Sequence, residues 1–188
     1  MKTLHKGTFR SFISAVLVWA LLWVTFASVT EAQTNGVNNV SDLPSPVCDS
    51  IAVEPGNILL FRAFAVGVQR YRWNGASWDF VEPVATLYAD ANYSVKLGVH
   101  YAGPTWEAIT GGKVVATRVA GCAPDPTAIP WLLLKTVSTD GPGIMNLVTY
   151  IQRVNTKGGL APTAPGASTG AIADVPYTTE YYFYRAKN

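Results

Sequence analysis

Turn-forming residues recur along the chain and separate segments that are too short for long helices. They include 74–75 (Asn-Gly), 103–104 (Gly-Pro) and the stronger break at 140–143 (Asp-Gly-Pro-Gly). Residues 69–73 and 77–81, on either side of the Asn-Gly pair, alternate polar with aromatic side chains. Such alternation around a dipeptide that readily adopts positive φ predicts a β-hairpin.

The same pattern predicts about nine or ten short strands, with little helix. Only residues 126–129 and 144–147 are suited to a short helical turn. Charged residues make up only 14% of the chain, and this low content, with many aromatics and turn residues, suits a β protein. We therefore expect an all-β fold, either a β-sandwich or a jelly-roll-like barrel. The expected strands are 58–68, 69–73, 77–81, 84–88, 95–101, 105–109, 113–119, 131–137, 147–154 and 175–185.

The first 32 residues have the composition of a secretory signal peptide. Lys2, Lys6 and Arg10 precede an apolar run over 12–27, and small residues around Ala32 favour cleavage before the next residue. The apolar run is shorter than the roughly twenty residues of a membrane-spanning helix. We therefore expect export to the periplasm or the exterior, with no transmembrane segment after cleavage. Residues 33–47 are expected to form a flexible leader, and 48–188 a single β domain.

Removal of this segment changes the charge balance. The chain has 14 Lys and Arg against 12 Asp and Glu, and residues 1–32 hold three of the basic residues and one of the acidic ones. The remainder therefore carries eleven groups of each sign and has no net charge. Because no long basic patch remains, we do not expect nucleic-acid binding.

Two cysteines, Cys48 and Cys122, are the only ones in the chain. A lone pair in an exported protein usually forms a disulfide. This bridge would close a loop of about 75 residues, worth roughly 4–5 kcal/mol in the chain-entropy model. The alternative is a redox-active or nucleophilic cysteine. The base that it needs could come only from His100, which is the one histidine outside the signal peptide.

His100 is the strongest candidate for chemistry. It lies beside the Gly-Pro turn, and a hairpin there would allow Glu107 to approach it, giving an imidazole–carboxylate pair suited to acid–base catalysis. Asp140 is an alternative partner. The competing interpretation is structural, with His100 hydrogen-bonded to fix the turn while Tyr101 and Trp106 pack.

Aromatic residues support a different hypothesis, a binding face for a carbohydrate or small polar ligand. Flat rings offer apolar area at little entropic cost, and neighbouring polar side chains would give directional hydrogen bonds. On an alternating final strand, Tyr182 and Tyr184 share one face and Tyr181 and Phe183 the other, so at least one pair should lie in the core. The candidate binding residues are Gln69, Tyr71, Trp73, Trp106, Gln152 and Arg153.

No metal site or cofactor is predicted. With one histidine outside the signal peptide and no free cysteine, only carboxylates would remain to complete a transition-metal site. No acidic run resembles a calcium loop. A serine hydrolase would normally show a Gly-x-Ser-x-Gly elbow, which this sequence lacks.

Several longer motifs occur in a characteristic order, at 64–69, 71–73, 100–107, 129–134, 150–159 and 181–184. With them the sequence resembles a family of small secreted bacterial, fungal and plant proteins, catalogued as domain of unknown function thirty-four fifty-five. The resemblance extends from about Val47 to Arg185 and implies no established activity. Some fungal members are labelled malate dehydrogenase, but this chain lacks the Gly-x-Gly-x-x-Gly turn of a nicotinamide-binding βαβ unit.

Together these features predict an exported, disulfide-bridged binding module for a carbohydrate or small polar ligand. A small extracytoplasmic enzyme that uses His100 with Glu107 or Asp140 is the first alternative. A structural or stress-response surface protein is the second.

Overall fold

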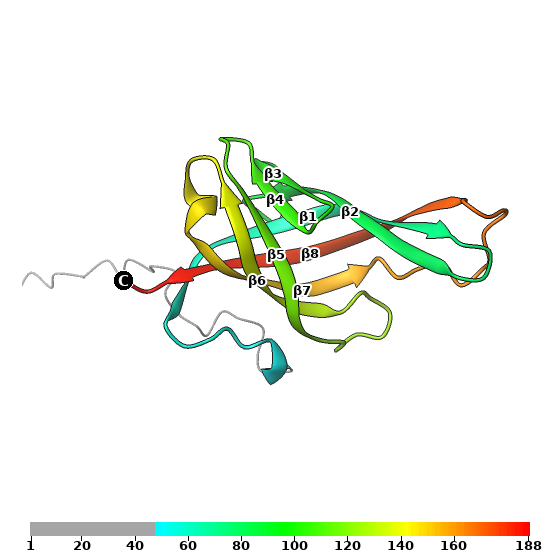
Figure 1. The fold of residues 1–188 in the computed structure, drawn as a ribbon, viewed down its shortest axis with the longest axis horizontal. Helices are drawn as coiled ribbons and strands as arrows, with labels where there is room; N and C mark the ends of the chain where they lie inside the picture. The colour runs from blue at the N-terminus through cyan, green and yellow to red at the C-terminus, as the bar shows by residue number, and fades with distance from the viewer. Residues whose placement is uncertain (1–47) are drawn as a thin grey trace, which may run out of the picture. The chain divides into compact units, whose positions relative to one another are not determined.

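The computed structural model describes residues 48–188, which form eight antiparallel strands (Figure 1). Two short 3-10 turns are the only helical elements in this range, η2 (Asp49–Ile51) and η3 (Ile144–Leu147). The strands are β1 (Asn57–Trp73), β2 (Trp78–Tyr88), β3 (Lys96–Tyr101), β4 (Thr105–Ala108), β5 (Lys113–Cys122), β6 (Trp131–Asp140), β7 (Val148–Gly158) and β8 (Ile172–Ala186).

Each strand pairs with the next in the sequence, and β1 pairs with β8 along most of its length, so the sheet closes as a barrel. Figure 1 shows these two longest strands running side by side. The all-β prediction is confirmed. Consecutive strands are neighbours throughout, an up-and-down order with no Greek-key crossing.

The strands number eight rather than nine or ten because two expected breaks are absent. Residues 58–68 and 69–73 form one continuous strand, and Pro83 lies inside β2. Proline is tolerated there because the pairing of β2 with β3 begins only at Ala85, so the missing N–H leaves no ladder bond unmade on that side. The predicted Asn-Gly hairpin is present, with Trp73 opposite Trp78.

The barrel interior is filled by small residues from β1 and large ones from β4 and β8. Ala63 and Ala65 face inward and are fully buried. A Cβ on Gly67, two residues further on, would collide with the backbone of β2. The interior that these small residues leave open is filled by Trp106, Tyr181 and Phe183, with other members of the same apolar cluster. An eight-stranded barrel has room inside for packed side chains or one small ligand.

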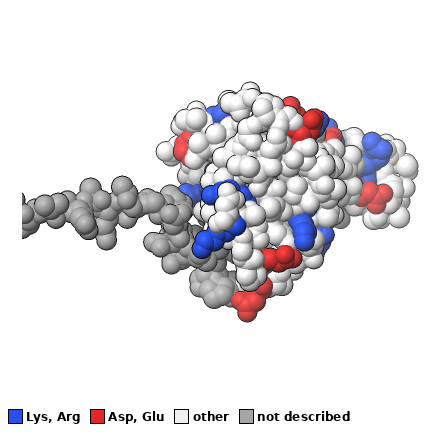
Figure 2. Space-filling model, turned by 60° about the vertical axis from the view of Figure 1, so that its left-hand side comes forward, with Lys and Arg blue, Asp and Glu red and all other residues white. Residues whose placement is uncertain are grey.

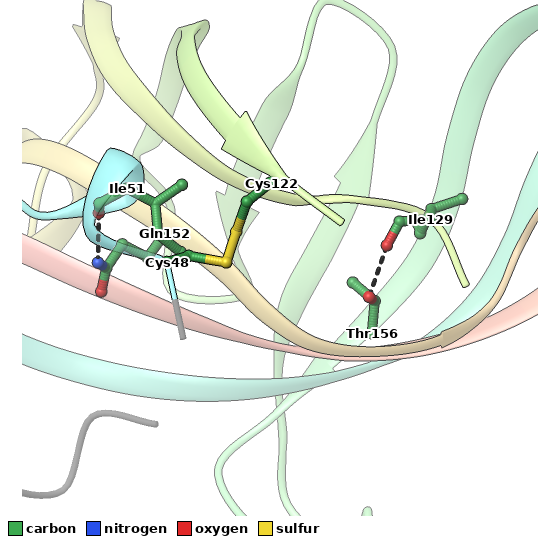
Figure 3. Close-up of a disulfide and its surroundings, with 6 residues drawn as sticks. All are labelled: Cys48, Ile51, Cys122, Ile129, Gln152 and Thr156. Atoms are coloured by element: carbon green, nitrogen blue, oxygen red, sulfur yellow. Dashed lines mark hydrogen bonds between the residues drawn. A yellow bond between two sulfur atoms is a disulfide. The ribbon is translucent and has the colours of Figure 1, made fainter. Parts of the chain in front are cut away.

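A second apolar cluster lies on the outside of the barrel, beneath the segment that carries η2. It consists of Ile51, Trp131, Leu133, Tyr150, Val154, Tyr182 and Tyr184. The predicted disulfide between Cys48 and Cys122 is present and joins this segment to the end of β5 (Figure 3). Both rows of β8 aromatics are therefore buried, one row inside the barrel and the other beneath η2.

The predicted signal peptide (1–32) and leader (33–47) lie outside the described residues. Within residues 48–188, no helix has the length and apolarity needed to cross a bilayer. Figure 2 shows a face on which a few Lys and Arg side chains are interspersed with Asp and Glu.

Candidate functional site

A cavity of about 430 Å³ opens into the barrel at one end. Because the strands run up and down in order, the β1–β2, β3–β4, β5–β6 and β7–β8 connections all lie at this end. The volume lies in the range of small-molecule sites, which hold about 300–1,000 Å³. The cavity is lined by Gln69, Tyr71, Phe80, Pro83, His100, Pro104, Trp106, Arg118, Ile129, Pro130, Leu132, Leu134, Arg153 and Tyr181.

The structure brings five of the sequence-predicted residues together in this lining. They come from four separate parts of the sheet and are Gln69, Tyr71, His100, Trp106 and Arg153. Inward alternation explains the grouping, since Gln69 and Tyr71 continue the row that Ala63 and Ala65 begin on β1.

His100 lies deep in this site and is only 3% exposed. Its ring stacks on Trp106 at a centroid distance of 4.2 Å, and its Nδ1 lies 2.8 Å from the carbonyl oxygen of Thr105. Because a carbonyl only accepts, Nδ1 carries the proton and Nε2 keeps its lone pair in the neutral ring. Burial lowers the pKa of His100 to about 3, with the positive charge of Arg153 acting in the same direction.

Glu107 does not share this site. It pairs with Val99 in the β3–β4 ladder, whereas His100 pairs with Trp106, so Glu107 and His100 point to opposite faces of the sheet. Outside the barrel, the carboxylate of Glu107 accepts a 2.7 Å hydrogen bond from the Tyr101 hydroxyl. This bond is the largest cause of a raised pKa at Tyr101.

Asp140 lies at the other end of the barrel, as the last residue of β6. There its carboxylate is 3.3 Å from the ammonium of Lys113 in an exposed ion pair. Neither predicted carboxylate partner therefore contacts His100. A general base works best with a pKa near the operating pH, and the buried imidazole is far from that condition.

Three buried polar atoms of the lining make no hydrogen bond of good geometry among the described residues, although the buried hydroxyl of Tyr177 lies close enough to Gln69 and Tyr181 to interact with both. They are the side-chain amide nitrogen of Gln69, the indole nitrogen of Trp106 and the hydroxyl of Tyr181. The three residues are 2%, 1% and 0% exposed. An unsatisfied buried donor costs about 1–3 kcal/mol, so three in one cavity call for a specific explanation.

Arg153 places positive charge beside these atoms. Its Nε and Nη2 donate to the carbonyl of Pro130 at 3.2 and 2.8 Å, which leaves three of its five N–H groups available. Burial raises the pKa of Tyr181 and the charge of Arg153 opposes this rise, although Arg153 does not meet the hydroxyl with hydrogen-bond geometry. The same charge acts on Tyr71, where burial again raises the pKa.

Two predicted binding residues lie elsewhere. Gln152 is buried on the outer face, where its amide nitrogen donates to the carbonyl of Ile51 at 2.7 Å and its oxygen accepts from Tyr184 at 2.7 Å (Figure 3 shows the first bond). Trp73 packs edge-to-face on Trp78 in the β1–β2 hairpin, against the β7–β8 loop. Both side chains are occupied by protein contacts.

Several lining residues were not predicted as part of a site. Leu132 and Leu134 were expected in a buried strand, and their two-residue spacing does place both on the inner face. Arg118 carried no local signal, because its role depends on the pairing of β5 with β6, where it stands opposite Leu134. Ile129 and Pro130 belong to the connection between these strands.

Within residues 48–188, no three His, Cys, Asp or Glu side chains gather in a way that could hold a metal ion. The lining offers nitrogen and hydroxyl donors and one neutral imidazole. The chemistry of the cavity is therefore that of hydrogen-bond donation within apolar and aromatic walls.

Comparison with known proteins gives one match. Neither the curated proteins nor the solved structures include a protein that matches this chain. Residues 54–185 match the family described as Protein of unknown function (DUF3455), which agrees with the resemblance seen in the sequence. Since the match covers most of the chain and the whole barrel apart from its last residue, Ala186, the protein belongs to this family.

Proposed function

We propose that this protein is an exported binding module that holds a small ligand in the cavity at the end of its barrel. The observation that carries the proposal is the set of three buried, unpartnered polar atoms on Gln69, Trp106 and Tyr181, all in the lining of one cavity. Ligand sites typically combine mainly apolar walls with a few convergent polar groups.

The aromatic side chains support a cavity rather than an open sugar-binding platform. Trp106 and Tyr181 are inside the barrel, and Tyr182 and Tyr184 are covered by the η2 segment. A ligand would therefore be enclosed by the barrel instead of stacking on an exposed row of rings. Of the two ligand classes predicted from the sequence, this arrangement favours the small polar molecule.

Export is part of the proposal and is supported by the signal-like N-terminus and by the disulfide between Cys48 and Cys122. Disulfides persist mainly in oxidising compartments. The enzyme alternative has less support, because neither Glu107 nor Asp140 contacts His100.

The test is a thermal-shift panel of monosaccharides, small aromatic alcohols and small aromatic acids on the purified protein. A variant that fills the cavity, Leu132→Trp, is compared with Val137→Trp, which places the same large ring at an exposed position of β6. We expect at least one compound to raise the melting temperature of the parent and of Val137→Trp but not of Leu132→Trp. Equal shifts in all three proteins would place binding outside the cavity and contradict the proposal.

A further inference from the structure

The unpartnered polar atoms of the cavity share a direction of hydrogen bonding. The amide nitrogen of Gln69 and the indole nitrogen of Trp106 can only donate, and the hydroxyl of Tyr181 can also donate. A molecule that satisfies all three must present acceptors. A sugar hydroxyl can accept as well, and the Nε2 lone pair of His100 can take its proton, so the choice between a hydroxyl and an anion rests on the charges of the lining.

The charges of the lining point the same way. Arg118 and Arg153 both line the cavity, from the strands on either side of β6, and none of the described lining residues is acidic. Among the described residues, neither arginine forms a salt bridge. Arg70, which lies on β1 next to the inward-facing Gln69, shows the usual arrangement, since it is paired with Asp174 at 2.8 Å and Glu82 at 3.0 Å.

The remaining lining residues are apolar, and they indicate that the part of the ligand away from its polar group is apolar as well. Phe80, Leu132 and Leu134 line the cavity together with three prolines and Ile129. A fully hydrated inorganic anion would gain nothing from these surfaces, whereas an apolar or aromatic group would be removed from water. The cavity therefore combines a cationic, donor-rich part with an apolar one.

We infer that the ligand is a small organic carboxylate with an apolar or aromatic body, the roughly four acceptor sites of its carboxylate being shared among N–H groups of Arg153 and Arg118 and the donors of Gln69, Trp106 and Tyr181. This inference rests on the proposed function and narrows it to one chemical class. Arginine binds carboxylates well because its planar N–H groups match the two oxygens.

The experiment uses four probes that share one aromatic body and differ in the polar group, namely phenylacetate, phenylacetamide, phenylethanol and phenethylamine. Each is titrated into the purified protein by calorimetry near neutral pH. We expect phenylacetate to bind about tenfold or more tightly than the two neutral probes, since hydrogen bonds to charged groups are the stronger ones, and phenethylamine to bind most weakly.

Arginine variants locate the effect. Arg153→Gln and Arg118→Gln should each weaken phenylacetate binding about tenfold and leave the neutral probes nearly unchanged. Arg70→Gln removes an outward-facing arginine of β1 and should change neither. Because Arg153 also holds the carbonyl of Pro130, Arg118→Gln provides a second test that does not disturb this contact.

The outcomes separate the two proposals. Equal binding of the acid and the neutral probes would overturn the carboxylate inference and leave the cavity as a ligand site. Stronger phenylacetate binding that survives both arginine variants would also overturn it. Failure of all four probes to bind would count against the cavity as a ligand site as well as against the carboxylate.

Discussion

Two buried glutamines face opposite sides of the same barrel wall and have different environments. Gln152 lies under the η2 segment, with its nitrogen bonded to Ile51 and its oxygen to Tyr184. Gln69 lies inside, 2% exposed, and its amide nitrogen makes no hydrogen bond of good geometry among the described residues, although the hydroxyl of Tyr177 lies close enough to interact with this side chain. The outer glutamine thus attaches a chain segment, although the hydroxyl of Tyr150 in the outer cluster makes no hydrogen bond of good geometry among the described residues, while the donors of Gln69, Trp106 and Tyr181 on the inner side lack such bonds.

This difference indicates that the two regions have different functions although both are buried: the outer one holds the chain together and the inner one is suited to a ligand. Beside the outer cluster, Gln152 bonds to the backbone carbonyl of Ile51, in the segment that carries η2 (Figure 3). Satisfied polar groups in a core fix one arrangement of the chain. Unsatisfied ones destabilise the free protein, and we attribute those of the cavity to a ligand that completes them.

The largest expected effect tests the outer region through its disulfide. Reduction, or the double variant Cys48→Ser with Cys122→Ser, frees the η2 segment and should lower the free energy of unfolding by about 4–5 kcal/mol. Denaturant unfolding of the oxidised and reduced protein measures this. Phenylacetate affinity of the folded fraction should stay unchanged, and its loss on reduction would show that the two regions are not independent.

The second prediction concerns the buried imidazole of the inner region. His100 has a folded pKa of about 3, against its ordinary value of 6.5, so between these values the unfolded chain binds a proton that the folded chain does not. The free energy of unfolding should therefore fall as the pH is lowered from about 6 to 4, by about 1.4 kcal/mol per pH unit from this residue alone.

His100→Gln is the matched variant, since its amide can still donate to the carbonyl of Thr105. Urea unfolding at several pH values should show a clearly flatter dependence between pH 6 and pH 4 for this variant. Parallel curves for the two proteins would mean that His100 is protonated in the folded state, contrary to its burial.

The third prediction tests the outer glutamine. Gln152→Leu leaves the Ile51 carbonyl and the Tyr184 hydroxyl without partners and should lower the free energy of unfolding by about 2–3 kcal/mol. Phenylacetate binding should not change, because Gln152 does not line the cavity. A variant as stable as the parent would show that Gln152 contributes little to holding the η2 segment.

The smallest expected effect on stability is that of Tyr181→Phe. The variant removes a hydroxyl that makes no hydrogen bond of good geometry to the neighbouring Tyr177 or Arg153, so the free energy of unfolding should change by no more than about 1 kcal/mol. Phenylacetate affinity should fall at the same time. Unchanged affinity would remove Tyr181 from the binding site and leave it as a packing residue.

Much of the fold could be predicted from local sequence. The Asn-Gly hairpin and the alternation on β8 follow from short-range rules, and the pairing of Cys48 with Cys122 follows from there being only two cysteines. The chain has fewer strands than predicted because the break expected after residue 68 and the break expected at Pro83 are both absent. Whether a proline interrupts a strand depends on which side carries a partner, and that is set by pairing distant in the sequence.

The site was predictable only in part. Gln69, His100, Trp106 and Arg153 are candidates by residue type, and the barrel brings them to one cavity. Sequence spacing could not separate Gln69 from Gln152, since both are single glutamines on alternating strands. Which face is inside depends on the register of the closed sheet, and a shift by one residue would exchange them.

The comparison of the two glutamines gives the most direct test of the account, in the variant Gln69→Leu. Two quantities are measured on this variant and on Gln152→Leu, the free energy of unfolding and the phenylacetate affinity. We expect the free energy of unfolding of Gln69→Leu to stay within about 1 kcal/mol of the parent's or to rise above it. We expect the same variant to bind phenylacetate at least about fivefold more weakly than the parent. A Gln69→Leu variant that loses about 2–3 kcal/mol of stability and binds phenylacetate as the parent does would contradict it, because Gln69 would then be a structural residue like Gln152.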